Sequence, residues 1–386
     1  MISPPLTRRS ALGLALAGVA ASTVRAEGAA SFAAVDAAAA ALVEDHGAPG
    51  VSLSLMKAGR IVHTRGFGSA NLETGTPAHP DSIYRIGSIT KQFTAAALMS
   101  LAEEGRLSPD DRLARFFPDF PRAGEITLRQ MLTHTSGLSN YTDTAGKDFL
   151  QEARLDYDAK ALYRLMLESK PLYSHEPGVV WDYSNTAYVL LGLLVEKIAG
   201  EPYGEFYKRR LFDRAGLLDT AVDDAAVVVA RRAAGYTPRP GVENAFDNAS
   251  FISMTIPGGA GSMRSTSEDL CRWHAALFGG KIVSAASLAQ MTTPQRLKDG
   301  SLPMSAVGPG AEKSAPVQYG FGLQRATVEG HQVIGHGGGI NGFRSNLQTF
   351  PDTGFTYALL INCEGGPKLD AHAKLLREAL VQAATA

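Results

Sequence analysis

A serine and a lysine stand three residues apart at the start of an apolar segment. Residues 84–99 read YRIGSITKQFTAAALM, so Ser88 precedes the apolar run and Lys91 lies within it. Residues three apart share one face of a helix, which lets Lys91 reach the Ser88 hydroxyl. Burial and the positive N-terminal end of the helix both lower the pKa of a lysine, and a neutral lysine can take the hydroxyl proton. The pair therefore predicts nucleophilic catalysis by Ser88 with Lys91 as its base.

The same spacing occurs at Ser54 and Lys57, where it predicts no chemistry. That segment alternates like a strand, so side chains three residues apart point to opposite faces of a sheet. A structural interpretation is also open for the first pair, with Ser88 capping the helix and Lys91 reaching solvent. The Ser-x-x-Lys pair alone does not decide between the two interpretations.

Two later segments carry polar residues that could complete a site with Ser88 and Lys91. The sequence WDYSN at 181–185 comes just before a helical run over 186–199, and GHGGGING at 335–342 ends a predicted strand. Each segment also has a structural interpretation, as a buried aromatic residue and a helix cap or as a flexible turn. Their joint occurrence with Ser-x-x-Lys favours the catalytic interpretation.

These three elements resemble the S-x-x-K, S-D-N and K-T-G signatures of the serine β-lactamase and penicillin-binding-protein superfamily. The Tyr-x-Asn form of the second element is similar to the class C β-lactamase branch, which also contains D,D-peptidases, D-aminopeptidases and carboxylesterases. LTHTSGL at 132–138 and PGGAGSM at 257–263 are similar to structural stretches of the same family. The resemblance covers nearly all of the chain beyond residue 26, in the family's order.

The resemblance implies a role for each polar residue of the first two elements. Ser88 would attack the substrate carbonyl and form an acyl-enzyme, with Lys91 as its base or electrostatic partner. Tyr183 would carry the proton to and from the leaving group, with its phenol pKa lowered by Lys91. Asn185 would hydrogen-bond the substrate and help to hold Lys91.

The third element would supply a strand beside the nucleophile. The resemblance implies an oxyanion hole made by the backbone N–H groups of Ser88 and Gly339, and glycines such as Gly338 let a ligand approach a strand closely. His336 stands where β-lactamases carry lysine, a permanent cation that can hold a substrate carboxylate. A histidine is charged only in part near neutral pH. His336 therefore weighs against efficient penicillin hydrolysis and resembles the D-aminopeptidase and peptidase members; its structural alternative is a turn histidine bonded to backbone.

The order of the predicted elements indicates an α/β (α+β) fold. Strands are expected at both ends of the chain with helices between them, which predicts one β-lactamase-like antiparallel sheet built from the two termini and flanked by helices. A mainly helical region, about 106–290, is expected as an insertion. The expected strands cover 50–57, 60–68, 320–326, 331–335, 345–350 and 355–363, and the expected helices cover 32–43, 88–104, 186–199, a segment with capping-box spacing at Ser265 and Glu268, and 369–383.

The N-terminus has the pattern of an export signal. Arg8 and Arg9 precede an apolar run that is too short to span a bilayer, followed by the peptidase-type sequence VRA. The paired arginines also resemble a twin-arginine signal, and a disordered or amphipathic start is the alternative. The pattern predicts a cleaved signal at 1–26, a single catalytic domain at 27–386, no membrane anchor after cleavage, and a periplasmic or secreted location.

Composition excludes several other classes of function. With 45% hydrophobic and 19% charged residues and a formal net charge of −1, the chain is globular and offers no electrostatic basis for binding nucleic acid. Its histidines show no metal-ligand spacing, and the chain contains no Gly-x-Ser-x-Gly elbow, so no metal, no cofactor and no α/β-hydrolase site is expected. Cys271 and Cys363 are expected to be separate buried thiols.

The sequence thus predicts an exported serine hydrolase that acts through a Ser88 acyl-enzyme on a small-molecule or peptide substrate containing a D-amino acid. A carboxylesterase or a β-lactamase on the same fold is the alternative within the superfamily. A non-catalytic protein that binds cell-wall peptides is the alternative from another class. No motif indicates the natural substrate or the oligomeric state.

Overall fold

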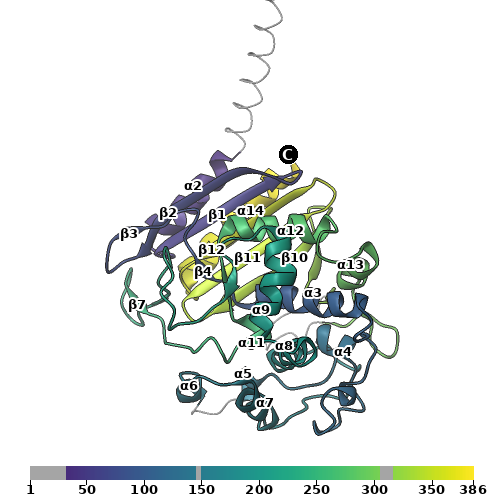
Figure 1. Ribbon diagram of the computed structural model, residues 1–386. Helices are drawn as coiled ribbons and strands as arrows, with labels where there is room; N and C mark the ends of the chain where they lie inside the picture. The colour runs from purple at the N-terminus through teal and green to yellow at the C-terminus, as the bar shows by residue number, and fades with distance from the viewer. Residues whose placement is uncertain (1–31, 145–148, 305–315) are drawn as a thin grey trace, which may run out of the picture.

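A seven-stranded sheet is made by the two ends of the chain (Figure 1). The computed structural model describes residues 32–144, 149–304 and 316–386, so the predicted signal at 1–26 lies outside the described residues. The strand order is β3-β2-β1-β12-β11-β10-β9, and each strand pairs antiparallel with its neighbours. The strands are β1 (Gly50–Lys57), β2 (Arg60–Asn71), β3 (Thr76–Pro77), β9 (Gln324–Val328), β10 (His331–Ile340), β11 (Phe343–Phe350) and β12 (Phe355–Ile361).

Helices cover both faces of this sheet. On one face, residues such as Leu53 of β1 share an apolar cluster with the first and last described helices. On the other face, Ser54 of the same strand hydrogen-bonds Ser267 at 2.7 Å, at the start of a third helix. Because both faces are buried, alternation along β1 separates apolar side chains from small polar ones. The three helices are α2 (Ala33–Glu44), α14 (Pro367–Thr385) and α12 (Ser267–Phe278).

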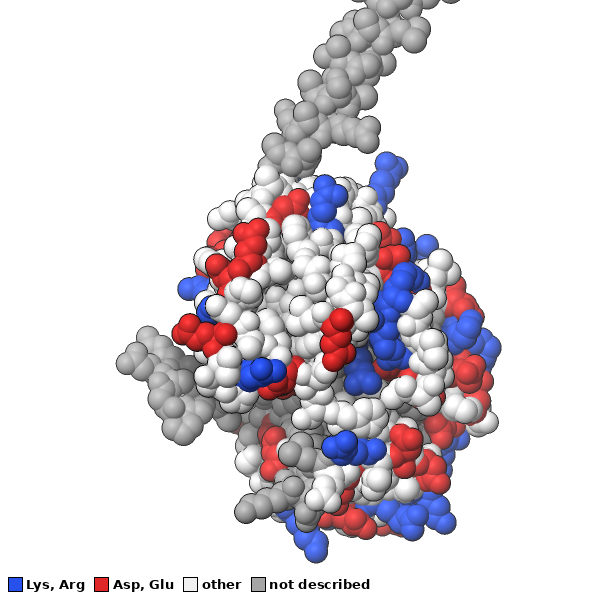
Figure 2. Space-filling view, turned by 90° about the vertical axis from the view of Figure 1, so that its left-hand side faces the viewer, with Lys and Arg blue, Asp and Glu red and all other residues white. Residues whose placement is uncertain are grey.

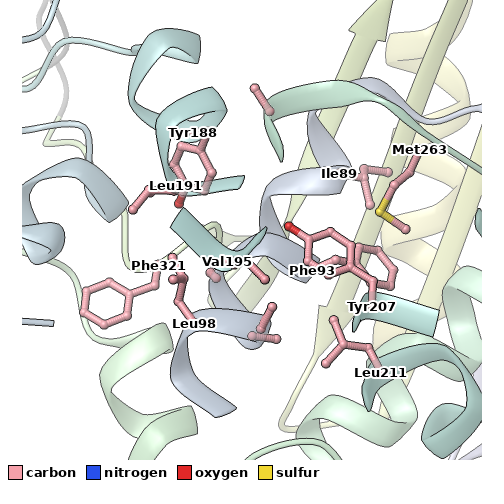
Figure 3. Packing of buried hydrophobic residues seen from close by; sticks show 14 of the residues in the cluster. Ile89, Phe93, Leu98, Tyr188, Leu191, Val195, Tyr207, Leu211, Met263 and Phe321 are labelled. Atoms are coloured by element: carbon pink, nitrogen blue, oxygen red, sulfur yellow. The ribbon is translucent and has the colours of Figure 1, made fainter. Parts of the chain in front are cut away.

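A mainly helical region occupies the lower half of the view in Figure 1. Its central pair, α3 and α8, packs through an apolar cluster to which Leu98, Leu191 and Val195 contribute (Figure 3). This cluster fixes the two helices that carry the candidate base and its partner. The helices are α3 (Thr90–Glu103), α4 (Leu128–Leu132), α5 (Tyr141–Thr144), α6 (Phe149–Glu152), α7 (Ala159–Leu167), α8 (Asn185–Ala199), α9 (Tyr203–Tyr207), α10 (Asp213–Ala215), α11 (Gly258–Gly261) and α13 (Ala285–Thr292).

The glycine-rich end of β10 is strand rather than turn. The strand was expected to stop at residue 335, yet Gly337 pairs with Asn346 and Gly339 with Arg344 of β11. Glycine has a low intrinsic preference for strands, but hydrogen bonding to the antiparallel strand β11 holds these residues extended. The strand therefore runs on past His336 and reaches the nucleophile.

The cap of α12 also differs from the expected one. The expected cap was Ser265, but the side chain of Thr266 accepts the hydrogen bond from the backbone N–H of Asp269. Ser265 is unavailable because it ends the short strand β8 (Met263–Ser265) and pairs there with Tyr84. The helix consequently starts one residue later than the sequence pattern indicates.

The surface carries charges of both signs (Figure 2), and both cysteines are buried. Basic and acidic side chains are interspersed on the face shown in Figure 2. Within the described ranges, no helix is both long and apolar enough to cross a bilayer. Cys271 and Cys363 are buried free thiols, which confirms the expectation for the two cysteines.

Candidate active site

Lys91 is fully buried, and three oxygen atoms surround its amine. Its Nζ lies 3.1 Å from Ser88 Oγ, 2.7 Å from Asn185 Oδ1 and 2.8 Å from the carbonyl oxygen of Ala260. These oxygens come from the turn before α3, from the first residue of α8 and from α11. The structural alternative for the pair is wrong, because Lys91 does not reach solvent and the Ser88 hydroxyl caps no helix.

The surroundings of this amine favour its neutral form. Burial lowers the pKa of Lys91 well below the usual value for lysine. A neutral amine keeps two N–H groups, which can donate to the carbonyl oxygens of Asn185 and Ala260, both of which only accept. Its lone pair then faces the Ser88 hydroxyl. Lys91 is thus placed to accept the serine proton.

Ser88 lies in a single 3₁₀ turn, η1 (Gly87–Ile89), whose backbone touches β10. A Cβ added at Gly87 would lie 2.9 Å from the Gly339 nitrogen, and one added at Gly338 would lie 2.1 Å from the Ile86 carbonyl oxygen. The backbones of Ser88 and Gly339 are therefore neighbours, as an oxyanion hole requires. Close packing against the turn, and not ligand approach, explains the glycine at 338. At Gly339 an added Cβ would meet nothing within 4 Å, so space is open beside the nucleophile.

Tyr183 contacts the same amine. The Lys91 Nζ lies 4.7 Å from the centroid of its ring. Burial raises the pKa of the Tyr183 phenol above its ordinary value, and a side-chain hydrogen bond with Ser88 opposes that shift. The expectation that Lys91 lowers the pKa of Tyr183 is therefore wrong, because desolvation of the phenolate dominates. Tyr183 is a protonated donor at neutral pH.

His336 is buried beside these groups with both ring nitrogens occupied. Its Nδ1 lies 2.5 Å from the carbonyl oxygen of Gly337, and its Nε2 lies 3.0 Å from the Tyr319 hydroxyl. Nδ1 therefore carries the proton, and Nε2 accepts from Tyr319. Burial is the main cause that lowers the pKa of His336 to about 4, and the Lys91 amine lowers it further whenever that amine is protonated. The partly charged histidine expected from the sequence is instead a neutral ring that offers a substrate no free donor.

The depressed pKa of His336 predicts a pH-dependent stability. Between its folded pKa of about 4 and the ordinary value of 6.5, the unfolded chain binds the proton and the folded chain does not. Stability from this group is therefore complete above pH 6.5 and falls as the pH drops towards 4. The loss between pH 7 and pH 4.5 is expected to be on the order of 2 kcal/mol.

Urea unfolding of the wild type and of His336→Gln at these two pH values measures the effect. The glutamine variant lacks this titration, so its free energy of unfolding should change less between pH 7 and pH 4.5. A buried histidine away from His336, such as His274, titrates alike in both proteins and cancels in the comparison. An equal change in the two proteins would show that His336 is not the group responsible.

His134 clamps the segment that carries Tyr183. Its carbonyl oxygen accepts from the Asp182 backbone N–H at 2.9 Å, and its Nδ1 accepts from the Ser184 backbone N–H at 3.1 Å. Its ring lies 4.3 Å from the Tyr183 ring, centroid to centroid. The residue is fully buried and has a φ of +58°, a conformation that few residues other than glycine and asparagine adopt readily. His134 therefore holds Tyr183 in place through the backbone of its two neighbours, Asp182 and Ser184, and through contact with its ring.

Sequence comparison identifies the family. The chain matches the Beta-lactamase family over residues 35–382, which is most of its length. The chain belongs to the β-lactamase family. The predicted resemblance is thereby confirmed.

Three similar proteins indicate which members of the β-lactamase family this chain resembles. Penicillin-binding protein 4* of Bacillus subtilis (strain 168) is 30% identical over 318 residues, and the D-aminopeptidase of Gluconobacter oxydans (strain 621H) is 26% identical over 316 residues. These alignments cover 79% and 81% of this chain. A D-stereospecific amidohydrolase from Streptomyces sp. superposes with a TM-score of 0.73 at 31% identity, over 90% of this chain and 98% of that chain.

The relatives differ in length from this β-lactamase family member. The chain spans 66% of the penicillin-binding protein and 55% of the D-aminopeptidase, but nearly the whole amidohydrolase. The superposition confirms the predicted fold class of an antiparallel sheet flanked by helices. The amidohydrolase and aminopeptidase relatives also support the predicted enzyme class, a serine hydrolase.

Sequence reasoning found part of this β-lactamase-family site and missed the rest. The structure brings together all seven predicted residues on η1, α3, α8 and β10 or next to them: Ser88, Lys91, Tyr183, Asn185, His336, Gly338 and Gly339. It adds His134, Tyr319 and the Ala260 carbonyl. His134 and Ala260 fall in the two stretches noted only as structural, LTHTSGL and PGGAGSM, while Tyr319 had no sequence signal. Within the described residues, no group of three or more His, Cys, Asp or Glu could hold a metal ion.

Proposed function

We propose that the protein is an exported serine hydrolase that cleaves an amide bond of a D-amino-acid-containing amide or peptide through an acyl-enzyme on Ser88. The observation that carries the proposal is the buried Lys91 amine, 3.1 Å from Ser88 Oγ, with carbonyl oxygens on its other two sides. That arrangement leaves a lone pair for the serine proton. The similarity to a D-stereospecific amidohydrolase and a D-aminopeptidase supports the substrate class.

Acylation follows from the positions of three side chains. Ser88 Oγ attacks the substrate carbonyl carbon while its proton passes to Lys91 Nζ, and the carbonyl oxygen becomes an oxyanion beside the backbone N–H groups of Ser88 and Gly339. The C–N bond then breaks, and Tyr183, which is protonated, gives its proton to the leaving amine. Lys91 then returns its proton to Tyr183, because burial raises the pKa of the phenol and lowers that of the amine. In deacylation water attacks the ester carbon, its proton passes through Tyr183 and Lys91 to Ser88 Oγ, and the bond between Oγ and the acyl carbon breaks.

The charge of the site favours an uncharged group at the His336 end of the substrate. His336 is neutral with both nitrogens in use, and Gly337 and Gly339 carry no side chain. This strand thus offers a substrate carboxylate neither a cation nor a hydroxyl. Amides and esters fit that surface better than penicillins, whose carboxylate needs a partner.

Release of ammonia from D- and L-phenylalanine amide tests the proposal directly. The D-enantiomer is expected to be cleaved at least about ten times faster, and Ser88→Ala is expected to cleave neither. Intact mass after incubation with benzylpenicillin, with Ser88→Ala as control, separates the alternatives. Labelling of Ser88 without turnover of any amide or ester would favour the binding protein. Hydrolysed penicillin with intact amides would favour a β-lactamase, and turnover of esters alone a carboxylesterase.

Two variants of His134 test its role in holding Tyr183. His134→Asn keeps an acceptor close to the Nδ1 position and tolerates the positive φ, whereas His134→Phe keeps the ring and leaves the buried Ser184 N–H without an acceptor. A misplacement of about 1 Å costs about 100-fold in rate, so kcat of the phenylalanine variant should fall by about 100-fold with little change in KM. The asparagine variant should stay within about tenfold of the wild type. Equal kcat values in the two variants would show that the acceptor is not what positions Tyr183.

We also propose export to the periplasm or the medium. Support comes from the two arginines, the short apolar run and the VRA sequence near the N-terminus. N-terminal sequencing of protein recovered outside the cytoplasm checks this, and the expected first residue is Glu27.

A further inference from the structure

Three arginines converge on one buried carboxylate away from the catalytic groups. Asp223, whose side chain is fully buried, accepts from Arg85 Nε at 3.0 Å, from Arg232 Nη1 at 2.8 Å and from Arg264 Nη1 at 3.2 Å. The cluster joins β4 (Tyr84–Arg85) to β8 and to the loop before β6 (Tyr236–Pro238). One negative charge thus faces three positive ones, and two positive charges are left in excess.

Several N–H groups of these arginines have no partner in the part of the chain that the structure describes. Among the described residues, Arg85 donates a hydrogen bond only from its Nε, so neither of its terminal nitrogens has a partner there. Arg264 likewise donates to a described residue only through Nη1, and its Nε is buried without an acceptor in those ranges. The second terminal nitrogen of Arg232, by contrast, donates to the carbonyl oxygens of Asp224 and Val227. Of these unused groups, the Nε of Arg264 is buried, and a buried donor without an acceptor is costly, so it marks a place for one.

The three arginines also line a cavity. Its volume is about 200 Å³, and its wall includes all three arginines, with Tyr84, Ala234 and Phe343 among the uncharged residues. The side chains of Arg85 and Arg264 are 14% and 16% exposed, so they are largely removed from bulk water. The neighbouring Asp224 does not balance the charge, because it is exposed and its side chain accepts from the Ala226 backbone N–H. Partly desolvated guanidinium groups bind oxyanions strongly through paired N–H donors.

We propose that this cavity is a binding site for a small oxyanion with two negative charges, of the phosphate or sulfate class. The volume admits such an ion, and its two charges match the excess. Arg85 and Arg264 supply the donors, while Arg232 holds the loop and Asp223 fixes the three guanidinium groups in place. The site is independent of the proposed reaction, and its test needs no substrate.

Isothermal titration calorimetry with sodium phosphate at pH 8 is the test, with sodium chloride at equal ionic strength as the blank. One phosphate is expected to bind per chain, and acetate, with one charge, is expected to bind at least about tenfold more weakly. Arg85→Met removes the unused donors of Arg85 but keeps those of Arg264, and it leaves Asp223 with two arginines, so the fold should persist. Its phosphate affinity should fall by about 10- to 100-fold, the scale of hydrogen bonds to a charged group. The matched control is Arg209→Met, which removes an exposed arginine paired with Glu201 and should bind like the wild type.

A second variant keeps the test decisive should Arg85→Met fail to fold. Ala234→Glu places a carboxylate at a residue that lines the cavity, and the folded variant should no longer bind phosphate. Heats no larger than those of the chloride blank, equal affinities for phosphate and acetate, or unchanged binding in Arg85→Met or Ala234→Glu would each overturn the proposal.

Discussion

Ser88→Ala is expected to lower kcat for a D-amino-acid amide by about six orders of magnitude, the loss seen when a catalytic serine acts as one unit with its base. The hydroxyl is the only atom removed, and it lies at the amine of Lys91. Without Oγ no acyl-enzyme forms, so the mass shift after a slow-turnover substrate or benzylpenicillin should vanish as well. Steady-state ammonia release measures the loss of kcat, and intact mass of the same sample measures the loss of the acyl-enzyme.

The fold should survive this change, because Ser88 caps no helix and is only half buried. Ser100→Ala is the matched control: it removes a hydroxyl from α3, the helix that follows the turn of Ser88, where the Ser100 hydroxyl donates to the carbonyl oxygen of Ala97. That variant should keep wild-type turnover. Measurable amide hydrolysis by a folded Ser88→Ala protein would overturn the mechanism.

Lys91→Met is expected to lower kcat by about three to five orders of magnitude with a smaller change in KM. Methionine fills most of the lysine volume but cannot take the serine proton. Asn185 and Ala260 lose their shared donor, which adds a stability cost of about 1–3 kcal/mol for the unpaired acceptors. Near-UV circular dichroism with single-turnover kinetics separates the loss of chemistry from the loss of fold.

The chain contains its own control for this prediction. Lys57 follows Ser54 at the same spacing as Lys91 follows Ser88, but it is exposed at the end of β1. Lys57→Met should therefore leave kcat and stability unchanged. A loss of kcat in Lys91→Met no greater than in Lys57→Met would show that Lys91 is not the base.

Tyr183→Phe should also lower kcat strongly, since it removes the proton donor for the leaving amine.

Sequence reasoning recovered the parts of the site that depend on local spacing. A three-residue separation on a helix brings Ser88 to Lys91, and the same separation on a strand keeps Ser54 from Lys57, as the structure shows. The sheet from both termini also followed from the pattern of strands and helices, because β1 alternates between apolar and small polar residues and β12 is a short, mostly apolar run.

What it missed depends on contacts between distant segments. The pKa of Tyr183 is set by burial, which no spacing encodes, and so its direction was predicted wrongly. The neutrality of His336 comes mainly from burial, and its Nε2 is occupied by Tyr319, a residue that meets it only in the folded chain. The clamp by His134 joins segments about fifty residues apart, and its positive φ has no sequence signature in a histidine.

The pairing of β1 with β12 also sets the order in which the molecule can be completed during synthesis. Val51 pairs with Ile361, so the first hairpin leaves the ribosome with one edge unsatisfied until almost the whole chain has been made. Contacts so distant in sequence slow folding, and a bare strand edge invites pairing with other chains. Strand β10, which lies against the turn of Ser88, arrives in the same late stretch. A chain that is incomplete or truncated before β10 therefore contains Ser88 but lacks the Gly339 backbone N–H that would stabilise the oxyanion. Such a chain is inactive and prone to aggregate.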